Sequence, residues 1–309
     1  MTFFVEIRPE DYNKTAFTQF SARRGAFDIA DALAMMWMSQ LAYESGAPRT
    51  IDVIGPHWGF NSVQAVPQRG QILDTHAIVG VRDDCTVVAF AGTDPGILGN
   101  LIADAEFKLS AANTHQGFQD SVDGMWSDLE PLLRSGPAPL FFTGHSLGAA
   151  MAAIAAERAV RLPVTIAAVY GFGMPRPGGP AFARSYGTLG ERTYRLVHGG
   201  DIVACVPDLV DAILPGRIRQ AIQFQHVGHM LGCASGGKFN RNAPLAPITD
   251  NDPHFTEGVL ADLRDHIHAF LAGRLLAPPA PGELGRLWAL LPFAIRDHLQ
   301  DRYWTALTP

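Results

Sequence analysis

Apolar and polar positions in the early part of the chain predict a helix followed by a hairpin. Asp28–Ser45 is rich in strong helix formers and opens with an acidic residue that suits a helix N-terminus. Two β-like runs follow, His76–Val81 and Cys85–Ala91, and the polar Arg82–Asp84 separates them. This pattern is typical of two strands joined by a tight turn.

Further along, strands and helices alternate. The expected elements, in order, are a helix at Asp120–Leu133, a strand at Leu140–Thr143, a helix from Ser146 to about Val160, strands at Thr165–Phe172 and Thr193–Val197, and a last core helix at Phe255–Leu271. The continuous apolar run of Thr165–Phe172 is typical of a parallel strand covered on both faces. The alternation predicts a doubly wound α/β sheet with right-handed crossovers.

The composition changes beyond Gly273. Ala277–Gly282 is rich in proline and predicts a linker or turn, and the tail after it carries apolar residues such as Trp288. We therefore expect one main domain over residues 1–273 and a C-terminal extension, 274–309, packed on it or appended to it.

Composition narrows the functional classes. The 309 residues carry 24 Lys and Arg against 30 Asp and Glu, a net charge of −6, which argues against a nucleic-acid binder. Cys85, Cys205 and Cys233 are too few for a disulfide framework, and the N-terminal residues do not resemble a secretory signal. No apolar run reaches the length of a membrane span. A cytoplasmic location is the default expectation, with export by a route independent of a signal left open.

A serine in a glycine-rich pentad is the strongest chemical signal. Gly144–Gly148 fits the pattern G-x-S-x-G, in which a strand-to-helix turn exposes a serine hydroxyl at a helix N-terminus. The pentad directly follows the predicted apolar strand and opens an alanine-rich helix, which is the placement that the motif requires. Ser146 is therefore the expected nucleophile.

A serine hydroxyl needs a base, and the base needs a carboxylate that orients it. The chain order of this fold places the acid after the nucleophile at the end of a later strand. Asp201 follows the Thr193–Val197 strand and two glycines, so Asp201 is the expected acid, with Asp208 and Asp211 as reserves.

Six histidines follow Asp201, and one of them should be the base. His266, after Asp265 and near the last core helix, is the expected base, and His254 is the second choice. The remaining four are set aside: His226 and His229 as turn or core residues, His268 as pointing elsewhere, and His298 as part of the tail. A metal site of His226, His229 and Cys233 fits by spacing, but such residues beside glycines are more often structural.

Acyl transfer also needs donors aimed at the oxyanion. The backbone N–H of Leu147, which follows the nucleophile, is one expected donor. Phe90–Asp94 follows an early strand, and Thr93 in this loop offers both an N–H and a hydroxyl as the second donor. A plain turn is the alternative interpretation of this loop.

These residues together resemble the class 3 lipases, the fungal-type triacylglycerol lipase family of the α/β-hydrolase superfamily. The similar segments, in the order of the family, are Val87–Thr93, Asn100–Asp104, His115–Phe118, Thr143–Gly148, Gly173–Arg176, Asp201–Pro207, and Asp265–His266 with Phe270. The resemblance implies an α/β-hydrolase fold, with a mostly parallel central sheet, helices on both faces and a short lid helix. It also implies Ser146, Asp201 and His266 as the triad.

The chain departs from the family pattern at several positions. Ala91 stands where the family usually has a basic residue or histidine, and Ala149 replaces a common glycine. The family's secretion signal and paired cysteines are not found, and residues 274–309 match no part of the family pattern. Gly96–Glu106 has an apolar face and fits either a mobile lid or a permanently packed helix.

The expected activity is that of a serine carboxylic ester hydrolase, a lipase that cleaves fatty-acyl esters of acylglycerols through an acyl-enzyme. The resemblance implies no metal or organic cofactor. Its partner would be an acyl-lipid substrate, with transient contact to a lipid interface, and the oligomeric state is left open. A phospholipase, a short-chain esterase and a non-catalytic scaffold or binding protein are the alternatives.

Overall fold

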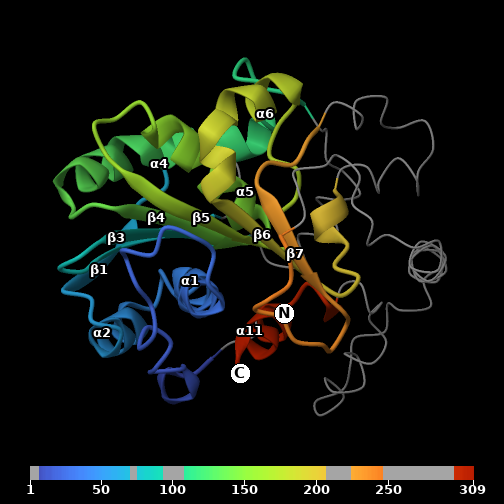
Figure 1. The fold of residues 1–309 in the computed structure, drawn as a ribbon. Coiled ribbons are helices and arrows are strands. Elements are labelled where there is room, and N and C mark those ends of the chain that lie inside the picture. The colour runs from blue at the N-terminus through green and yellow to red at the C-terminus, as the bar shows by residue number, and fades with distance from the viewer. Residues whose placement is uncertain (1–6, 70–74, 93–107, 207–223, 246–295) are drawn as a thin grey trace, which may run out of the picture.

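A seven-stranded sheet forms the centre of the computed structural model, which describes residues 7–69, 75–92, 108–206, 224–245 and 296–309 (Figure 1). The strands, which lie in the sheet in chain order, are β1 (Ser62–Val66), β2 (Ala77–Val81), β3 (Thr86–Phe90), β4 (Leu140–His145), β5 (Ile166–Phe172), β6 (Thr193–His198) and β7 (His229–Cys233). The first three strands pair antiparallel, and β3 to β7 pair parallel. This mostly parallel sheet confirms the predicted fold class.

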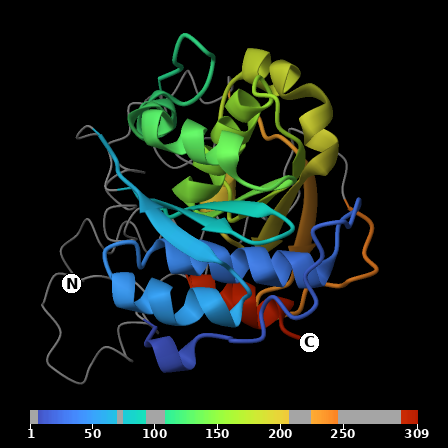
Figure 2. The ribbon, with the colours of Figure 1, turned by 90° about the vertical axis from the view of Figure 1, so that its left-hand side faces the viewer.

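Helices cover both faces of the sheet (Figures 1 and 2). One layer holds α4 (Gln116–Ser135), α5 (Leu147–Ala159) and α6 (Pro180–Tyr186), and the opposite layer holds α1 (Ile29–Ala42), α2 (Pro48–His57) and α11 (Gln300–Leu307). Three short 3-10 helices complete the described elements: η1 (Pro9–Asp11), η2 (Gly187–Arg192) and η3 (Val203–Cys205). Among the described helices, none has both the length and the apolar character needed to cross a membrane.

The alanine-rich sequence of α5 explains its close approach to the sheet. Nearly all of its side chains are buried, from Leu147 to Ala159, and the helix packs on β3, β4 and β5. Small side chains let the helix backbone lie close to the parallel strands, so that the first turn of α5 is fixed against the end of β4. This packing sets the position of the residue between β4 and α5.

The last described residues belong to a core cluster. Tyr303 is fully buried, Ala306 and Leu307 are 3% exposed, and all three pack in the cluster that also contains Met35 of α1 and Phe172 of β5. Helix α11 contacts α1 and β6. Residues 296–309 are therefore built into the layer beneath the sheet. The expected helix at 255–271 and the expected linker at 277–282 lie outside the described residues.

The start of α1 carries a buried carboxylate. Asp28 caps the helix by accepting a 2.7 Å hydrogen bond from the Ala30 N–H, as its acidic N-terminus predicted. Asp31, one turn later, is 1% exposed and accepts a 3.0 Å hydrogen bond from the Ser21 N–H, with the Arg24 guanidinium 3.5 Å away. Burial outweighs these two contacts and raises the pKa of Asp31 to about 6.

Replacing Asp31 with asparagine should therefore stabilise the fold at neutral pH. A raised folded-state pKa means that the wild-type protein loses stability as pH rises through about 4 to 6, and an uncharged side chain avoids that loss. We expect a gain of about 1–2 kcal/mol near pH 7.5 and little change near pH 4, after allowing for the lost attraction to Arg24. Urea unfolding at both pH values measures it, with Asp52→Asn on the exposed face of α2 as the control. An equal change in unfolding free energy at both pH values would contradict the raised pKa of Asp31.

Candidate active site

The turn between β4 and α5 places Ser146 in a strained backbone conformation. Ser146 has φ 59° and ψ −134°, a region that residues with a side chain rarely adopt. Its N–H donates a 2.9 Å hydrogen bond to the Phe172 carbonyl at the end of β5. Leu147 is the first residue of α5, so its backbone N–H has no partner within the helix. The geometry is that of a nucleophile elbow, as the pentad predicted.

Both glycines of the pentad are required by close backbone contacts. A Cβ at Gly144 would collide with the backbone of Gly148 and Ala149, and a Cβ at Gly148 would collide with the carbonyl of Phe90. None of these atoms belongs to a flexible side chain that can move away. The two glycines thus let the turn close and let α5 pack against the sheet at the nucleophile.

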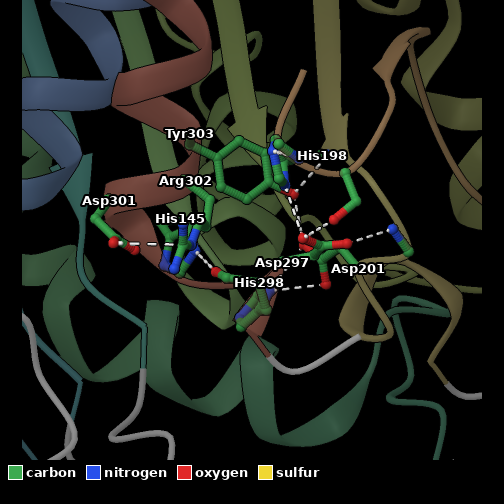
Figure 3. A network of polar contacts seen from close by, with 11 residues as sticks. His145, His198, Asp201, Asp297, His298, Asp301, Arg302 and Tyr303 are labelled. Carbon is green, nitrogen blue, oxygen red and sulfur yellow. Dashed lines mark hydrogen bonds and ion pairs between the residues drawn. The ribbon is translucent and has the colours of Figure 1, made fainter. Parts of the chain in front are cut away.

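Asp201 lies just beyond β6 and is fully engaged. Its carboxylate accepts hydrogen bonds from His298 Nδ1, 2.9 Å from each oxygen, and from the Tyr303 hydroxyl at 2.5 Å (Figure 3). The Val203 N–H donates a further bond to Oδ1 at 2.8 Å. Burial alone would raise the pKa of Asp201, but His298 and Tyr303 outweigh it and hold the pKa below its usual value. Asp201 is therefore an ionised, immobile carboxylate that orients an imidazole.

His298 occupies the place beside Asp201 that the sequence analysis gave to His266. Its side chain is 2% exposed, and Gly173 leaves room for it, because a Cβ at Gly173 would collide with Asp201 Oδ2 and with the His298 ring. Gly173 also has φ +58°, which favours glycine. With Nδ1 donating to Asp201, the opposite nitrogen, Nε2, is the free acceptor of the neutral ring.

His145 ties the histidine to the nucleophile turn. Its Nε2 lies 2.7 Å from the His298 carbonyl oxygen, and its Nδ1 lies 3.0 Å from the Tyr43 hydroxyl. Since a carbonyl only accepts, Nε2 carries the proton and Nδ1 accepts from Tyr43. Burial, and then the neighbouring His298, lower the pKa of His145 to about 3, so the ring stays neutral. The residue before Ser146 thus holds the main chain of His298.

Two buried polar atoms at this place make no hydrogen bond with the part of the chain that the structure describes. They are Ser146 Oγ and His298 Nε2. A buried hydroxyl and a buried ring nitrogen without partners are costly, and such atoms occur at sites kept ready for a ligand. Hydrogen bonds between a nucleophile and its base are often long before substrate binds. The arrangement can therefore perform nucleophilic acyl transfer.

Several predicted residues lie outside the described residues. They are Thr93, the lid segment Gly96–Glu106, the reserve acids Asp208 and Asp211, the predicted base His266, and His254 and His268. Of the other histidines, His226 is buried and His229 faces Glu191 at 3.3 Å. Among the described residues, no group of three or more His, Cys, Asp or Glu side chains is placed to hold a metal ion.

His298 was set aside as part of the tail, although the sequence carries a signal for it. The dipeptide that favoured His266, an aspartate followed by a histidine, recurs at Asp297–His298, with Tyr303 close behind. Because residues 274–309 were expected to be an extension, Asp297–His298 was set aside. The burial of α11 against α1 removes the reason for that choice.

Part of the chain is similar to one known protein family. Residues 87–210 match the family model described as Lipase (class 3). A secreted mono- and diacylglycerol lipase of Malassezia globosa is 37% identical over 98 residues, which is 29% of this chain and 32% of that protein. A lipase of Rhizopus niveus is 33% identical over 135 residues, or 39% of this chain and 34% of that protein. The chain thus matches about a third of the length of these curated relatives.

Solved structures share the fold. The lipase from Rhizopus microsporus var. chinensis superimposes with a TM-score of 0.57 at 20% identity, covering 87% of this chain and 85% of that one. Lipase II from Rhizopus niveus gives a TM-score of 0.54 at 21% identity, covering 72% of this chain and 88% of that one. At this level of identity the likeness establishes the α/β-hydrolase fold.

The relatives contradict the expected cytoplasmic location. The matched Malassezia globosa protein is named a secreted lipase, so the default drawn from cysteine content and the N-terminal residues is wrong. Cys85, Cys205 and Cys233 form no disulfide. A core of this size needs no disulfides to fold, so few cysteines carry little information about the compartment.

Proposed function

We propose that the protein is a serine carboxylic ester hydrolase, because residues 87–210 match the class 3 lipase family model and the chain has an α/β-hydrolase fold. In this proposal Ser146 is the nucleophile, His298 the base and Asp201 the orienting acid. The observation that carries it is the buried Asp201–His298 pair, which His145 ties to the Ser146 turn, together with a buried Ser146 hydroxyl that bonds to none of the described residues.

The proposed reaction follows from these positions. Ser146 Oγ attacks the ester carbonyl carbon, and its proton passes to His298 Nε2 while Nδ1–H stays bonded to Asp201. The tetrahedral intermediate collapses, the alcohol leaves with the proton from Nε2, and an acyl-enzyme forms. Water then attacks the acyl group with the same proton transfers and releases the acid.

The oxyanion needs two donors during both steps. The N–H of Leu147, which has no partner within α5 and lies at the positive end of that helix, suits the first. Thr93 remains the proposed second donor, because it follows directly after β3 and Gly92. A Cβ at Gly92 would meet the Ser146 Cβ and the Tyr43 hydroxyl, so the chain passes close to the nucleophile immediately before Thr93.

The proposed substrate is a fatty-acyl ester of an acylglycerol. Both relatives described above are named lipases, and the name of one specifies mono- and diacylglycerols. These names favour an acylglycerol substrate. The net charge of −6 offers no general attraction to anionic lipid, so contact with a lipid interface would be mainly apolar. The proposal requires no metal or organic cofactor.

A panel of substrates tests the proposed function. Short soluble esters, emulsified diacylglycerols and triacylglycerols, and phospholipid vesicles should be assayed side by side, below and above the concentration at which an interface forms. We expect release of fatty acid from acylglycerols, with a higher rate once an interface is present. Hydrolysis confined to soluble esters would indicate an esterase, release from vesicles alone would indicate a phospholipase, and no turnover of any ester would refute the proposal.

A further inference from the structure

A second buried carboxylate lies directly before His298. Asp297 is 4% exposed, and its Oδ2 accepts a 2.9 Å hydrogen bond from the Gly200 N–H, one residue before Asp201. Its Oδ1 accepts a 2.8 Å bond from the Ser235 hydroxyl and lies 3.3 Å from His198 Nδ1 (Figure 3). Both oxygens are thus used, although no sequence pattern singled out this residue.

The three groups around Asp297 come from two neighbouring strands. His198 ends β6, and Ser235 follows β7 by two residues. The Gly236 N–H donates a 3.2 Å bond to His198 Nε2, so Nδ1 carries the proton and points to Asp297. Asp297 therefore joins the ends of both strands to the segment that begins α11.

The backbone between β6 and Asp201 is shaped around this carboxylate. Gly199 has φ +56°, and a Cβ there would collide with Asp297 Oδ2 and come within 2.9 Å of the Ser235 backbone. The Gly199 N–H bonds to the Cys233 carbonyl at 2.9 Å. The loop that carries Asp201 thus reaches its position only with the Asp297 carboxylate packed against it.

We propose that Asp297 is a positioning residue that sets the orientation of His298 toward Asp201. This inference rests on the proposed function, because it assigns a role within the same site. His298 is held by its ring on Asp201 and by its carbonyl on His145, which fixes two points. Asp297 fixes the third, because it anchors the preceding residue to Gly200 next to Asp201, so that acid and base share one rigid support.

The placement of His298 Nε2 depends on angles as well as on distances. These two contacts and the packed α11 hold His298 from the C-terminal side alone, and a rotation of the residue about them would move Nε2 relative to Ser146. Two hydrogen bonds to the Asp297 carboxylate, from the Gly200 N–H and the Ser235 hydroxyl, remove this freedom, and His198 Nδ1 lies 3.3 Å from the same carboxylate. A misplacement of about 1 Å at a reacting atom costs about 100-fold in rate, so a loose support lowers kcat without altering substrate contacts.

Asp297→Asn and Ser235→Ala test the proposal, with Asp301→Asn as the matched control. Asparagine keeps the size of the side chain but loses the charge and turns one acceptor into a donor facing Gly200 or Ser235. We expect Asp297→Asn to lower kcat by about 100-fold with KM nearly unchanged, and Ser235→Ala to lower it by about tenfold. Asp301 lies four residues further along and pairs with Arg302 at 3.8 Å rather than bonding to Gly200 or Ser235, so its variant controls for the removal of a nearby negative charge.

A second readout separates this proposal from the proposed function. The proton on His298 Nδ1 should give a deshielded, exchange-protected NMR resonance, assigned by its loss in His298→Gln and its retention in His198→Gln. We expect Asp297→Asn to broaden or shift this resonance while circular dichroism stays that of the wild type. An unchanged resonance with unchanged kcat would overturn the positioning role. If the wild type hydrolyses no ester, the proposed function fails, and the resonance still decides the role of Asp297.

Discussion

Replacing His298 with glutamine should lower kcat for ester hydrolysis by a factor on the order of 10⁴ or more. The substitution removes the nitrogen that takes the proton from Ser146, and no other described imidazole bonds to the Asp201 carboxylate. His145 cannot replace it, because both of its nitrogens are used and burial holds its pKa near 3. Steady-state hydrolysis of a chromogenic ester measures the loss.

His266→Gln is the decisive comparison, because His266 was the base that the sequence favoured. We expect this variant to retain far more activity than His298→Gln. Circular dichroism and thermal unfolding of both variants establish that each is folded. A large loss in His266→Gln together with a small loss in His298→Gln would return the role of base to His266 and would leave the Asp201–His298 pair without a catalytic role.

Deleting residues 299–309 should abolish cooperative folding as well as activity. The deletion removes Tyr303, which is fully buried, together with the buried Ala306 and Leu307, and it exposes the face of α1 that α11 covers. Loss of several core side chains costs roughly 4 kcal/mol or more, a large share of the stability of a typical domain. Thermal and urea unfolding monitored by circular dichroism measure the effect.

Tyr303→Phe is the control for this deletion. It keeps the aromatic ring in the core and removes the hydroxyl that donates to Asp201 at 2.5 Å. We expect the variant to fold, with activity reduced by roughly tenfold because Asp201 loses one of its donors. If the truncated chain instead unfolds cooperatively at the wild-type temperature, α11 is an appendage, as the sequence first indicated for residues 274–309.

The elements around Ser146 could be predicted because their signals are local. The apolar run of β4, the two glycines around Ser146 and the alanine-rich α5 lie next to each other in the chain, so one segment contains the whole turn. Asp201 was predictable for a similar reason, because it follows β6 directly. These positions depend on local backbone conformation, which the types of neighbouring residues determine.

Edge elements were not predictable in the same way. Strand β1 lies at the edge of the sheet and four of its five residues, Ser62 to Ala65, are not buried, so it lacks the apolar pattern of a strand. Helix α2 contains Pro56, which argues against a helix in a sequence. Tertiary packing on β1 and η1 holds α2 in place.

The proposed base, His298, was the hardest residue to predict because its position depends on a contact far along the chain. His298 meets Asp201 only because α11 packs under the sheet against α1. Neither the length nor the apolar face of α11 indicates this contact in the sequence. Two Asp–His dipeptides competed, at 265–266 and 297–298, and the sequence context favoured the first because it lies near the last predicted helix. Asp297 had no signal of its own, since its partners lie on β6 and beyond β7.

Covalent labelling of the nucleophile is the most direct measurement of whether His298 activates Ser146. An alkyl fluorophosphonate, a reagent that esterifies activated serines, should be applied to the wild type, His298→Gln and His266→Gln, and the modified peptide identified by mass spectrometry. The account predicts stoichiometric modification of Ser146 in the wild type and in His266→Gln, with strongly slowed labelling in His298→Gln. Labelling of Ser146 at the wild-type rate in His298→Gln would contradict it.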